Sequence, residues 1–214
     1  MNTFEQEVEL CVKLLSEGKV FIYPTDTIWG IGCDATNAKA IDKIYKIKNR
    51  PAGKGLIILI DSVERLKDYV KNPSPIAADL IRSAKNPLSI IYKDSKGLAK
   101  NLTPDGSVCI RVTTNEFCKE VIKRLGHPIT STSANLSGEP SPANFIDISE
   151  EMKNAADYVV SLYHDVIVKP KASTIIKINE DNSFDTFPLA GHDSSRTRRR
   201  GIWKTELNDS RSRK

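Results

Sequence analysis

The sequence predicts a single α/β domain in which a twisted mixed sheet is covered by helices. Segments with a helical period of apolar residues alternate with short strand-like runs, and the connections between them are short. Several of the runs are apolar throughout, and "GLIILI" at 55–60 is typical of a strand buried on both faces. A length of 214 residues, with 39% hydrophobic and 28% charged residues, suits a globular domain of this kind.

The first elements are predicted to be a helix, a strand and a loop. Thr3 and Gln6 match a capping box, and apolar residues at helical spacing follow until Gly18 ends the helix. "KVFIY" (19–23) predicts a strand that leads into a glycine-containing loop, "PTDTIWGIGCDAT" (24–36).

The middle of the chain predicts three helices and three strands. Asn37 is expected to cap a helix that Pro51 ends, and the strand at 55–60 follows. The same patterns then predict helices at 62–70 and 75–84 and strands at 87–93 and 107–112.

The last third repeats the alternation. Thr113 and Glu116 suggest another capping box, and Gly126 ends that helix. "PITSTS" (128–133) predicts a strand. The final predicted elements are a short helix at 149–155 and strands at 158–163 and 173–178.

The positive net charge belongs to the end of the chain. Residues 189–214 hold eight Lys and Arg against three Asp and Glu, which accounts for the whole net charge of +5. We therefore expect the folded domain to span 1–188 and the segment 189–214 to be a basic, flexible tail. The neutral body argues against a protein that exists mainly to bind nucleic acid.

Composition also indicates the cellular compartment. No apolar run approaches the roughly 20 residues that a membrane span needs. The N-terminus is acidic and amphipathic, unlike a signal peptide. The four cysteines lack metal-binding or CxxC spacing and are expected to be buried, reduced thiols: Cys11, Cys33, Cys109 and Cys118. We expect a cytoplasmic protein with no metal site of its own.

Lysine and arginine side chains crowd the end of the second predicted helix. Lys48 shares the apolar face of this helix with Ile41 and Ile44, and Arg50 follows just before Pro51. Cations at a helix C-terminus are favourable by themselves, but a buried charge without a partner is costly. The cluster is therefore either helix-end electrostatics or an anion site, which a phosphate would suit.

Three further polar stretches lie at the ends of predicted strands. The Thr-Asp-Thr run at 25–27 suggests a turn stabilised by its own side chains. Arg111 lies in a strand otherwise built for burial, so we expect it to pair with a carboxylate of the protein or of a ligand. "ITSTSANLSGEPSP" (129–142) is either a turn or a strand-end loop that holds an anionic group.

Taken in order, these motifs match one family. "YPTDTIWGIGCDATN", "IYKIKNRPAGKGLIIL", "SVCIRVT" and "TSTSANLSGEPSPAN" resemble the YrdC-like threonylcarbamoyl-adenylate synthases, over about residues 8–178. The resemblance implies the YrdC-like fold, a twisted α/β sheet with a concave and locally basic face, in its short, single-domain bacterial type.

The resemblance also implies a reaction. These nucleotidyltransferases combine L-threonine, bicarbonate and ATP, with Mg²⁺, to give threonylcarbamoyl-adenylate and pyrophosphate. A separate transferase complex then moves the threonylcarbamoyl group to the adenosine 3′ of the anticodon in ANN-decoding tRNAs. Positioning and electrostatic stabilisation of the phosphates would carry such a reaction, since no motif pairs a nucleophile with a base.

Site residues follow from the same resemblance. The family's K-x-R element falls on Lys48 and Arg50, and its S-x-N element on Ser133 and Asn135; these four are the expected catalytic residues. Threonine is expected to contact Thr27, Arg111, Ser133 and Ser173. ATP is expected to contact Lys48, Arg50, Lys54, Ser107 and Asn135.

The chain departs from the family pattern in places, and other functions compete. Leu59 stands where some relatives have a histidine near threonine, and no arginine follows 173–178 in the register where relatives often place one near the nucleotide. Arg196 or a neighbour is a candidate substitute. The alternatives are a non-catalytic RNA-binding module and the carbamoyl-adenylate chemistry of hydrogenase-maturation carbamoyl transferases, whose zinc-finger motifs are absent here.

Overall fold

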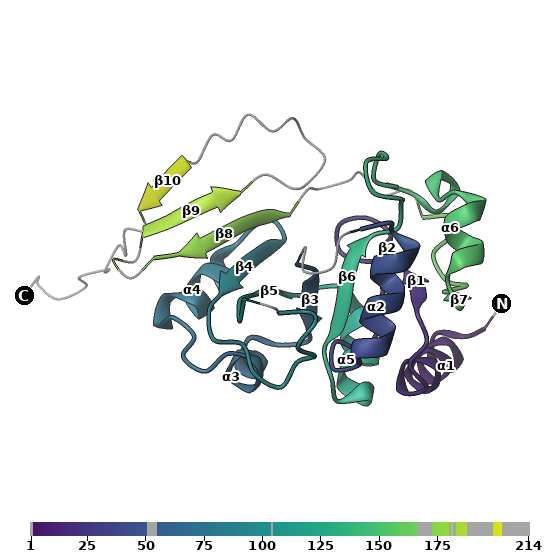
Figure 1. Ribbon diagram of the computed structural model, residues 1–214, viewed down its shortest axis with the longest axis horizontal. Coiled ribbons are helices and arrows are strands. Elements are labelled where there is room, and N and C mark those ends of the chain that lie inside the picture. The colour runs from purple at the N-terminus through teal and green to yellow at the C-terminus, as the bar shows by residue number, and fades with distance from the viewer. Residues whose placement is uncertain are drawn as a thin grey trace, which may run out of the picture.

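A single mixed sheet forms the centre of the molecule. The computed structural model describes residues 2–50, 55–103, 105–166, 173–179, 181 and 183–187, and the backbone of 199–202. In this part of the chain the ten strands lie in the order β10-β9-β8-β4-β5-β3-β6-β2-β1-β7 (Figure 1). Three neighbouring pairs are parallel, β3 with β5, β4 with β8 and β1 with β7, and the others are antiparallel. The predicted fold class is confirmed.

The elements have the following bounds. The strands are β1 (Phe21–Tyr23), β2 (Gly30–Gly32), β3 (Ile57–Ile60), β4 (Leu88–Tyr92), β5 (Val108–Val112), β6 (Ile129–Ser133), β7 (Tyr158–Val159), β8 (Thr174–Ile178), β9 (Ser183–Phe187) and β10 (Arg199–Ile202). The helices are α1 (Phe4–Ser16), α2 (Ala38–Ile47), α3 (Leu66–Tyr69), α4 (Pro75–Ser83), α5 (Glu116–Leu125) and α6 (Glu150–Ala155), with 3-10 turns at Val63–Arg65 and Phe145–Asp147.

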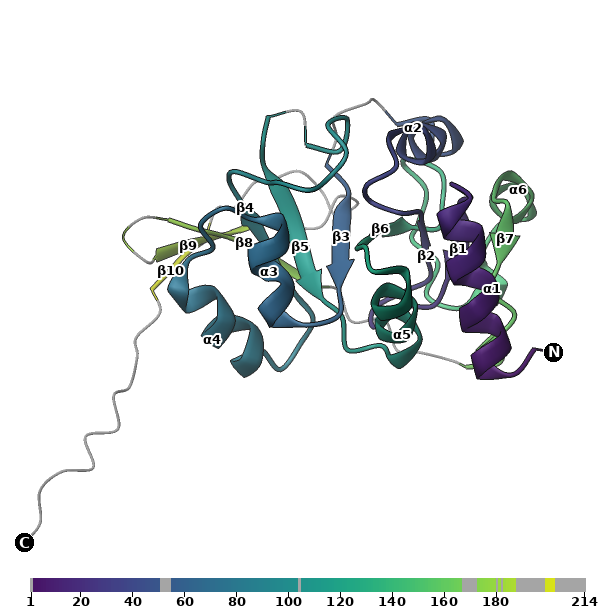
Figure 2. The same cartoon turned by 90° about the horizontal axis from the view of Figure 1, so that it is seen from below.

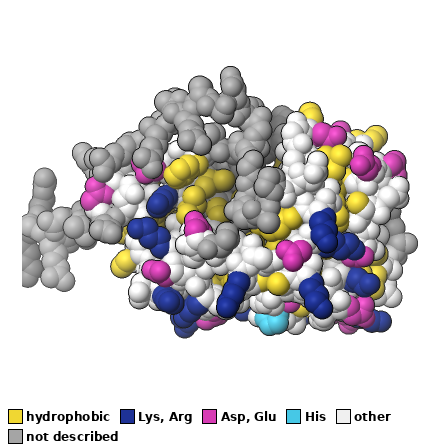
Figure 3. Space-filling view, viewed as in Figure 1, with side chains coloured by type: hydrophobic (Ala, Val, Ile, Leu, Met, Phe, Trp, Pro, Cys, Tyr) yellow, Lys and Arg dark blue, Asp and Glu magenta, His cyan; other side chains and the backbone are white. Residues whose placement is uncertain are grey.

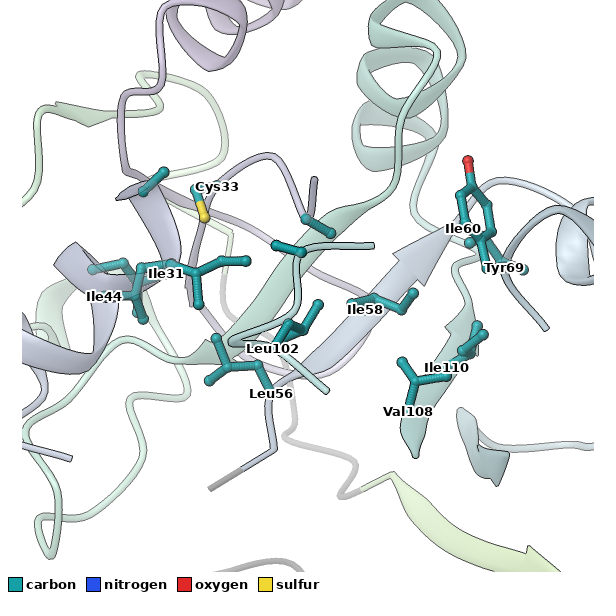
Figure 4. Close-up of a cluster of buried hydrophobic side chains, with 14 of the residues drawn as sticks. Ile31, Cys33, Ile44, Leu56, Ile58, Ile60, Tyr69, Leu102, Val108 and Ile110 are labelled. Carbon is teal, nitrogen blue, oxygen red and sulfur yellow. The ribbon is translucent and has the colours of Figure 1, made fainter. Parts of the chain in front are cut away.

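The two faces of the sheet are covered to different extents. One face packs against α2, α3, α4 and α6 around a large core that includes Ile44, Ile58 and Ile110 (Figure 4). The other face has a smaller core beneath α1 and α5, which lie against each other (Figure 2). This smaller core contains residues of β1, β3 and β6, and it contains none of β4, β5, β8 or β9. Over those four strands, no described helix contributes buried apolar side chains to this face.

Several predicted helix signals are confirmed, and one is wrong. Thr3 forms its capping box with Gln6, and Asn37 accepts a hydrogen bond from the amide of Ala40 at the start of α2. The expected cap at Thr113 is wrong, because Asn115 accepts the hydrogen bond from the amide of Cys118 instead. Asn is as good a cap as Thr, so the helix simply begins two residues later.

Three strands were not predicted, and one is shorter than predicted. The expected loop at 24–36 contains β2, which pairs with β1 and β6. A Cβ atom at Gly32 would lie 2.0 Å from the carbonyl oxygen of Thr130, so only glycine allows β2 to pack this closely. Beyond β8, the strands β9 and β10 extend the sheet. Of the predicted strand at 158–163, only Tyr158–Val159 forms β7.

The basic tail falls mostly outside the described residues. Its segment Arg199–Ile202 is β10, which pairs antiparallel with β9, and the division of the chain at 188 and 189 stays a prediction. The four cysteines are free, and Cys11, Cys33 and Cys118 are buried as expected, whereas Cys109 is only half-buried. Among the described residues, no helix has both the length and the apolar character that crossing a membrane requires.

Candidate active site

Three chain segments meet at one end of the central strands β5, β3 and β6. β3 runs parallel to β5, with Ile57 opposite Cys109, and antiparallel to β6, with Ile57 opposite Ser131. When this register is continued from Ile57 back to Gly55, Gly55 lies between the start of β5 and the end of β6. Figure 3 shows hydrophobic side chains gathered on the viewer's side over β4 and β8.

Lys48 joins the end of α2 to the loop that follows β6. Its side chain is 2% exposed, and its Nζ donates hydrogen bonds to the carbonyl oxygens of Ser133 and Asn135, at 2.6 Å each. No carboxylate of the described residues lies within ion-pair distance of this ammonium group. Burial, and then the charge of Arg50, lowers the pKa of Lys48 to about 8. Lys48 therefore points inward, as its place on the apolar face predicts.

Asn135 closes the loop that Lys48 holds. It is 8% exposed, and its Nδ2 donates to the carbonyl oxygen of Glu139 at 2.6 Å. The Glu139 carboxylate in turn accepts a hydrogen bond from the amide of Leu136 at 3.1 Å. The stretch after β6 is thus a turn, and a buried cation is bound to its backbone; the turn and the strand-end site are compatible interpretations.

Arg50 supplies a second positive charge at this end of the central strands. Its guanidinium donates to the carbonyl oxygen of Gly55 at 3.0 Å and reaches the hydroxyl of Thr132 at 3.5 Å. Burial lowers the pKa of Arg50, and its Nε has no hydrogen-bond partner within the described structure. We call Lys48, Arg50, Ser133 and Asn135 the cationic corner. It has two cations held by neutral oxygens, and so it can accept an anion.

A second polar group lies on the face of the sheet that α1 and α5 cover, where Arg111 of β5 is opposite Leu59 of β3. Arg111 is 3% exposed, and its NH2 lies 3.5 Å from Oδ1 of Asp26, whose side chain is 4% exposed. Its NH1 donates to the hydroxyl of Thr27 at 3.4 Å. We call Asp26 and Arg111 the buried ion pair. The expectation that Arg111 pairs with a carboxylate is confirmed, and the carboxylate belongs to the protein.

The loop between β1 and β2 presents Asp26 and Thr27 to Arg111. Thr25 shapes this loop, because its hydroxyl donates to the carbonyl oxygen of Ile28 at 2.6 Å and accepts from the amide of Thr27 at 3.1 Å. The thiol of Cys118 on α5 donates a hydrogen bond to the carbonyl oxygen of Pro24. The predicted side-chain-stabilised turn is confirmed.

The same loop connects the buried ion pair to the cationic corner. The carbonyl oxygen of Trp29 accepts a hydrogen bond from the amide of Ala134 at 3.1 Å, and Gly30 pairs with Ser133 across β2 and β6. Trp29 itself is buried and packs beside Phe145 and His164, so its side chain belongs to the core.

The remaining predicted residues are less closely joined. Ser173 is buried just before β8, and the hydroxyl of Ser107 donates to the carboxylate of Asp105. Within the described structure, neither side chain hydrogen-bonds to the cationic corner or to the buried ion pair. Lys54 lies outside the described residues. Among the described residues, no group of three His, Cys, Asp or Glu side chains is arranged to hold a metal ion.

Sequence reasoning missed two residues of this region. Asp26 was assigned only to a turn, although a carboxylate partner for Arg111 was expected. Ser89 was not singled out; it lies on β4 directly opposite Arg111, is fully buried, and its hydroxyl has no hydrogen-bond partner in the described part of the chain. A signal existed for Asp26, since a buried arginine needs an acid. None existed for Ser89, whose role depends on strand pairing.

A family model and several relatives match the sequence of this chain. The Sua5/YciO/YrdC family model, described as "Telomere recombination", matches residues 13–185. The threonylcarbamoyl-AMP synthase of Pseudoalteromonas translucida is 31% identical over 160 residues, which cover 73% of this chain and 86% of that protein. The threonylcarbamoyl-AMP synthase of Psychromonas ingrahamii is 37% identical over 137 residues, covering 62% and 72%.

Solved structures share the fold. P. abyssi Sua5 in complex with L-threonine superposes with a TM-score of 0.71 at 25% identity, and the match covers 83% of this chain and 52% of that one. The chain therefore spans about half the length of that relative. E. coli YciO, with a TM-score of 0.71 at 21% identity, is covered over 87% of its length, against 85% of this chain. At that identity, the likeness to YciO concerns the fold alone.

Proposed function

Since the chain belongs to the Sua5/YciO/YrdC family, we propose that it synthesises threonylcarbamoyl-adenylate from L-threonine, bicarbonate and ATP and releases pyrophosphate. The observation that carries this proposal is that Lys48 donates hydrogen bonds to the carbonyl oxygens of Ser133 and Asn135. These bonds bring the K-x-R and S-x-N elements together in the cationic corner. The threonylcarbamoyl-AMP synthases similar to this chain, and the L-threonine bound to P. abyssi Sua5, support the choice of substrates.

In this proposal the cationic corner binds ATP. Lys48 and Arg50 face the triphosphate, and Asn135 and the Ser133 backbone fix the loop beside it. Negative charge gathers on the phosphates as pyrophosphate leaves, and preorganised cations in a site that excludes water stabilise it without reorganising. Lys54 and Ser107 remain proposed ATP contacts by resemblance.

The amino acid would lie beside Arg111. A guanidinium group offers paired donors that match a carboxylate, and the hydroxyl of Thr27 already lies 3.4 Å from it. Ser133 and Ser173 are the further threonine contacts that the resemblance implies. The neutral amine of threonine takes up carbon dioxide derived from bicarbonate and forms a carbamate. A carbamate oxygen then attacks the α-phosphorus of ATP, and the bond to pyrophosphate breaks.

Magnesium is proposed only as a companion of ATP. Mg²⁺ in ATP-dependent sites is usually held by one or two carboxylates together with the phosphates and water. The described residues of the cationic corner are cations and neutral oxygens, which do not form such a site. We therefore assign no protein ligand to the ion and no step that runs through it.

We propose that the product serves tRNA modification, through a separate transferase complex that carries the threonylcarbamoyl group to the adenosine 3′ of the anticodon. The product is a mixed anhydride between a carbamate and a phosphate, so it is an activated donor with a good leaving group. The names of its relatives, threonylcarbamoyl-AMP synthases, support the product, and the resemblance of the motifs implies its use on tRNA. Direct binding of tRNA by this chain is not part of the proposal.

A pyrophosphate-release assay on the full chain tests the proposed reaction. Release should require L-threonine, bicarbonate and ATP together, with Mg²⁺ present. Omitting any one should reduce the rate to background, and Lys46→Ala, at an exposed position of α2, is a matched control that should behave like the wild-type chain. Pyrophosphate release without threonine would indicate another carbamoyl-adenylate chemistry. Salt-sensitive RNA binding without any release would favour the RNA-binding module.

A further inference from the structure

The buried ion pair is incomplete as the protein alone forms it. Asp26 and Arg111 are within ion-pair distance, yet neither carboxylate oxygen of Asp26 has a hydrogen-bond partner in the described structure. Arg111 Nε also lacks one. Buried polar atoms in folded proteins are nearly always hydrogen-bonded, so three such atoms in one ion pair call for an explanation.

A purely structural role explains these atoms poorly. A buried ion pair stabilises a fold only when its geometry is good and further hydrogen bonds satisfy the remaining atoms. Glu7 is an example of a satisfied carboxylate in this chain, since it accepts hydrogen bonds from Tyr158, Ser161 and Asn2. Asp26 has no such set, although its side chain is only 4% exposed.

We infer that Asp26 binds the α-nitrogen of the amino-acid substrate, next to the Arg111 that binds its carboxylate, so that this site selects zwitterions. The inference rests on the proposed function. It adds a substrate-binding residue and a reason for the choice of substrate class.

Charge balance supports this assignment. Asp26 and Arg111 together are neutral, so a ligand with only a carboxylate would leave a net negative charge in a buried place, which is costly. An α-amino acid is itself neutral overall and brings one charge of each sign. Its carboxylate can lie against Arg111 and its nitrogen against Asp26, which keeps the site neutral and satisfies the free oxygens.

The contact is compatible with the reaction. The substrate nitrogen carries at least one N–H as the ammonium, as the neutral amine and as the carbamate. Asp26 can accept a hydrogen bond from each of these forms. It therefore orients the nitrogen in every state and does not need to take its proton.

Titration calorimetry with three ligands tests the inference on the full chain. L-threonine carries both charges, 3-hydroxybutanoate lacks the amine and L-threoninol lacks the carboxylate. In the wild-type chain, L-threonine should bind at least about 10-fold more tightly than either analogue, the scale of a charge-assisted hydrogen bond. Asp26→Asn should weaken threonine binding by about 10- to 100-fold and leave 3-hydroxybutanoate unchanged or improved.

Asp68→Asn is a matched control. Asp68 also lies near an arginine, 3.3 Å from Nε of Arg65, but it is an exposed residue of α3, which packs against the other face of the sheet. This variant should bind all three ligands like the wild-type chain. If Asp26→Asn does not fold, the wild-type comparison decides, and equal binding of threonine and 3-hydroxybutanoate overturns the inference.

Different results would remove the proposed function and the inference about Asp26. A wild-type chain that binds no threonine removes both the proposed function and the inference. A wild-type chain that binds threonine, together with a folded Asp26→Asn variant that keeps the full preference over 3-hydroxybutanoate, removes only the inference. Threonine-dependent pyrophosphate release is then unaffected as support for the reaction.

Discussion

The cationic corner and the buried ion pair are both polar and largely buried, but their hydrogen bonding differs. In the cationic corner, Lys48 donates to two carbonyl oxygens and Asn135 is bound to Glu139. In the buried ion pair, both oxygens of Asp26 and Nε of Arg111 have no hydrogen-bond partner in the described structure. One region is largely complete before any ligand arrives, and the other is not.

This difference has a consequence for mutagenesis. A side chain that is already hydrogen-bonded supports the fold as well as the reaction, so its loss should reduce both stability and activity. A side chain with free polar atoms contributes little to the fold through them, and its loss should appear mainly in ligand binding. Stability and affinity measured on the same variants therefore separate the two kinds of site.

The largest effect is expected from the two cations of the corner. Lys48→Ala and Arg50→Ala should each lower the rate of pyrophosphate release by about 100-fold or more, the scale of one lost charge-stabilising donor. Lys48→Ala should also lower the melting temperature by a few degrees, because it leaves the Asn135 carbonyl group without its donor, at about 1–3 kcal/mol, whereas the Ser133 carbonyl oxygen still accepts from the amide of Asn135.

Arg50→Ala should melt close to the wild-type chain, because within the described part of the chain its side chain makes only one short hydrogen bond, to Gly55. Melting curves and initial rates on both variants, with Lys46→Ala as control, distinguish the two cations. Near-normal turnover in both would remove the corner from the mechanism, and equal melting of the two would show that Lys48 does not hold the loop.

The next effect is a pH dependence of ATP binding. The pKa of Lys48 is lowered to about 8, mainly by burial, so Lys48 loses its charge between pH 7 and 9. If ATP binds only the charged form, its affinity should fall by about 10-fold over this range, because the charged fraction falls by that factor. Calorimetry across the range measures this, and Lys48→Ala should give a flat profile.

Stability should not follow the same course. The unfolded chain binds a proton at Lys48 below about pH 10.5, its ordinary pKa, but the folded chain does so only below about pH 8. The unfolded state therefore holds more protons between these values, so the contribution of Lys48 to stability rises as the pH rises. The neutral amine still has two donors for its two carbonyl partners. A parallel loss of stability and affinity would contradict this assignment.

A smaller difference is expected between the two residues of the S-x-N element. Asn135→Ala removes the hydrogen bond to Glu139, so it should lower the melting temperature by a few degrees and weaken ATP binding by about 10-fold. Ser133 contributes its carbonyl oxygen to Lys48, and alanine keeps that group. Ser133→Ala should therefore melt like the wild-type chain and raise only the Michaelis constant for threonine, by about 5-fold. A fall in melting temperature for Ser133→Ala, with unchanged kinetics, would make its hydroxyl a structural group.

Much of the fold was predictable because its signals are local. Helix caps such as Thr3 and Asn37, and the apolar run at 55–60, act through near neighbours in the chain. The strand β2 was missed because it is three residues long and has two glycines, and only its pairing with β1 and β6 makes it a strand. β9 and β10 were missed for the same reason, since polar and basic residues dominate their sequences.

The candidate site divides in the same way. Lys48 was predictable because its helical spacing places a charge on an apolar face, which is a conflict that a sequence displays. Its partners were not, because they are backbone atoms of a loop 85 or more residues away. Asp26 and Ser89 reach Arg111 only through a turn and through the pairing of β4 with β5. Strand order and register decide such contacts.

The smallest predicted effect belongs to Ser89. Its hydroxyl is fully buried, lies opposite Arg111 across β4 and β5, and has no hydrogen-bond partner in the described structure. A buried hydroxyl without a partner destabilises the fold, so Ser89→Ala should melt at the same temperature as the wild-type chain or slightly above it. If the hydroxyl meets the threonine carboxylate beside Arg111, its loss removes one hydrogen bond and should weaken threonine binding by about 2- to 5-fold.

The test of Ser89 needs both a melting curve and a threonine titration. Ser16→Ala is the control, because the Ser16 hydroxyl bonds to Val12 on the exposed side of α1, away from the site. Weaker threonine binding at unchanged stability places Ser89 with Asp26 among the groups that a ligand completes. A drop in melting temperature with unchanged binding shows instead that the hydroxyl supports the fold. The polar atoms that wait for a ligand would then belong to the buried ion pair alone, and Ser89 on β4 would not be one of the ligand-binding groups.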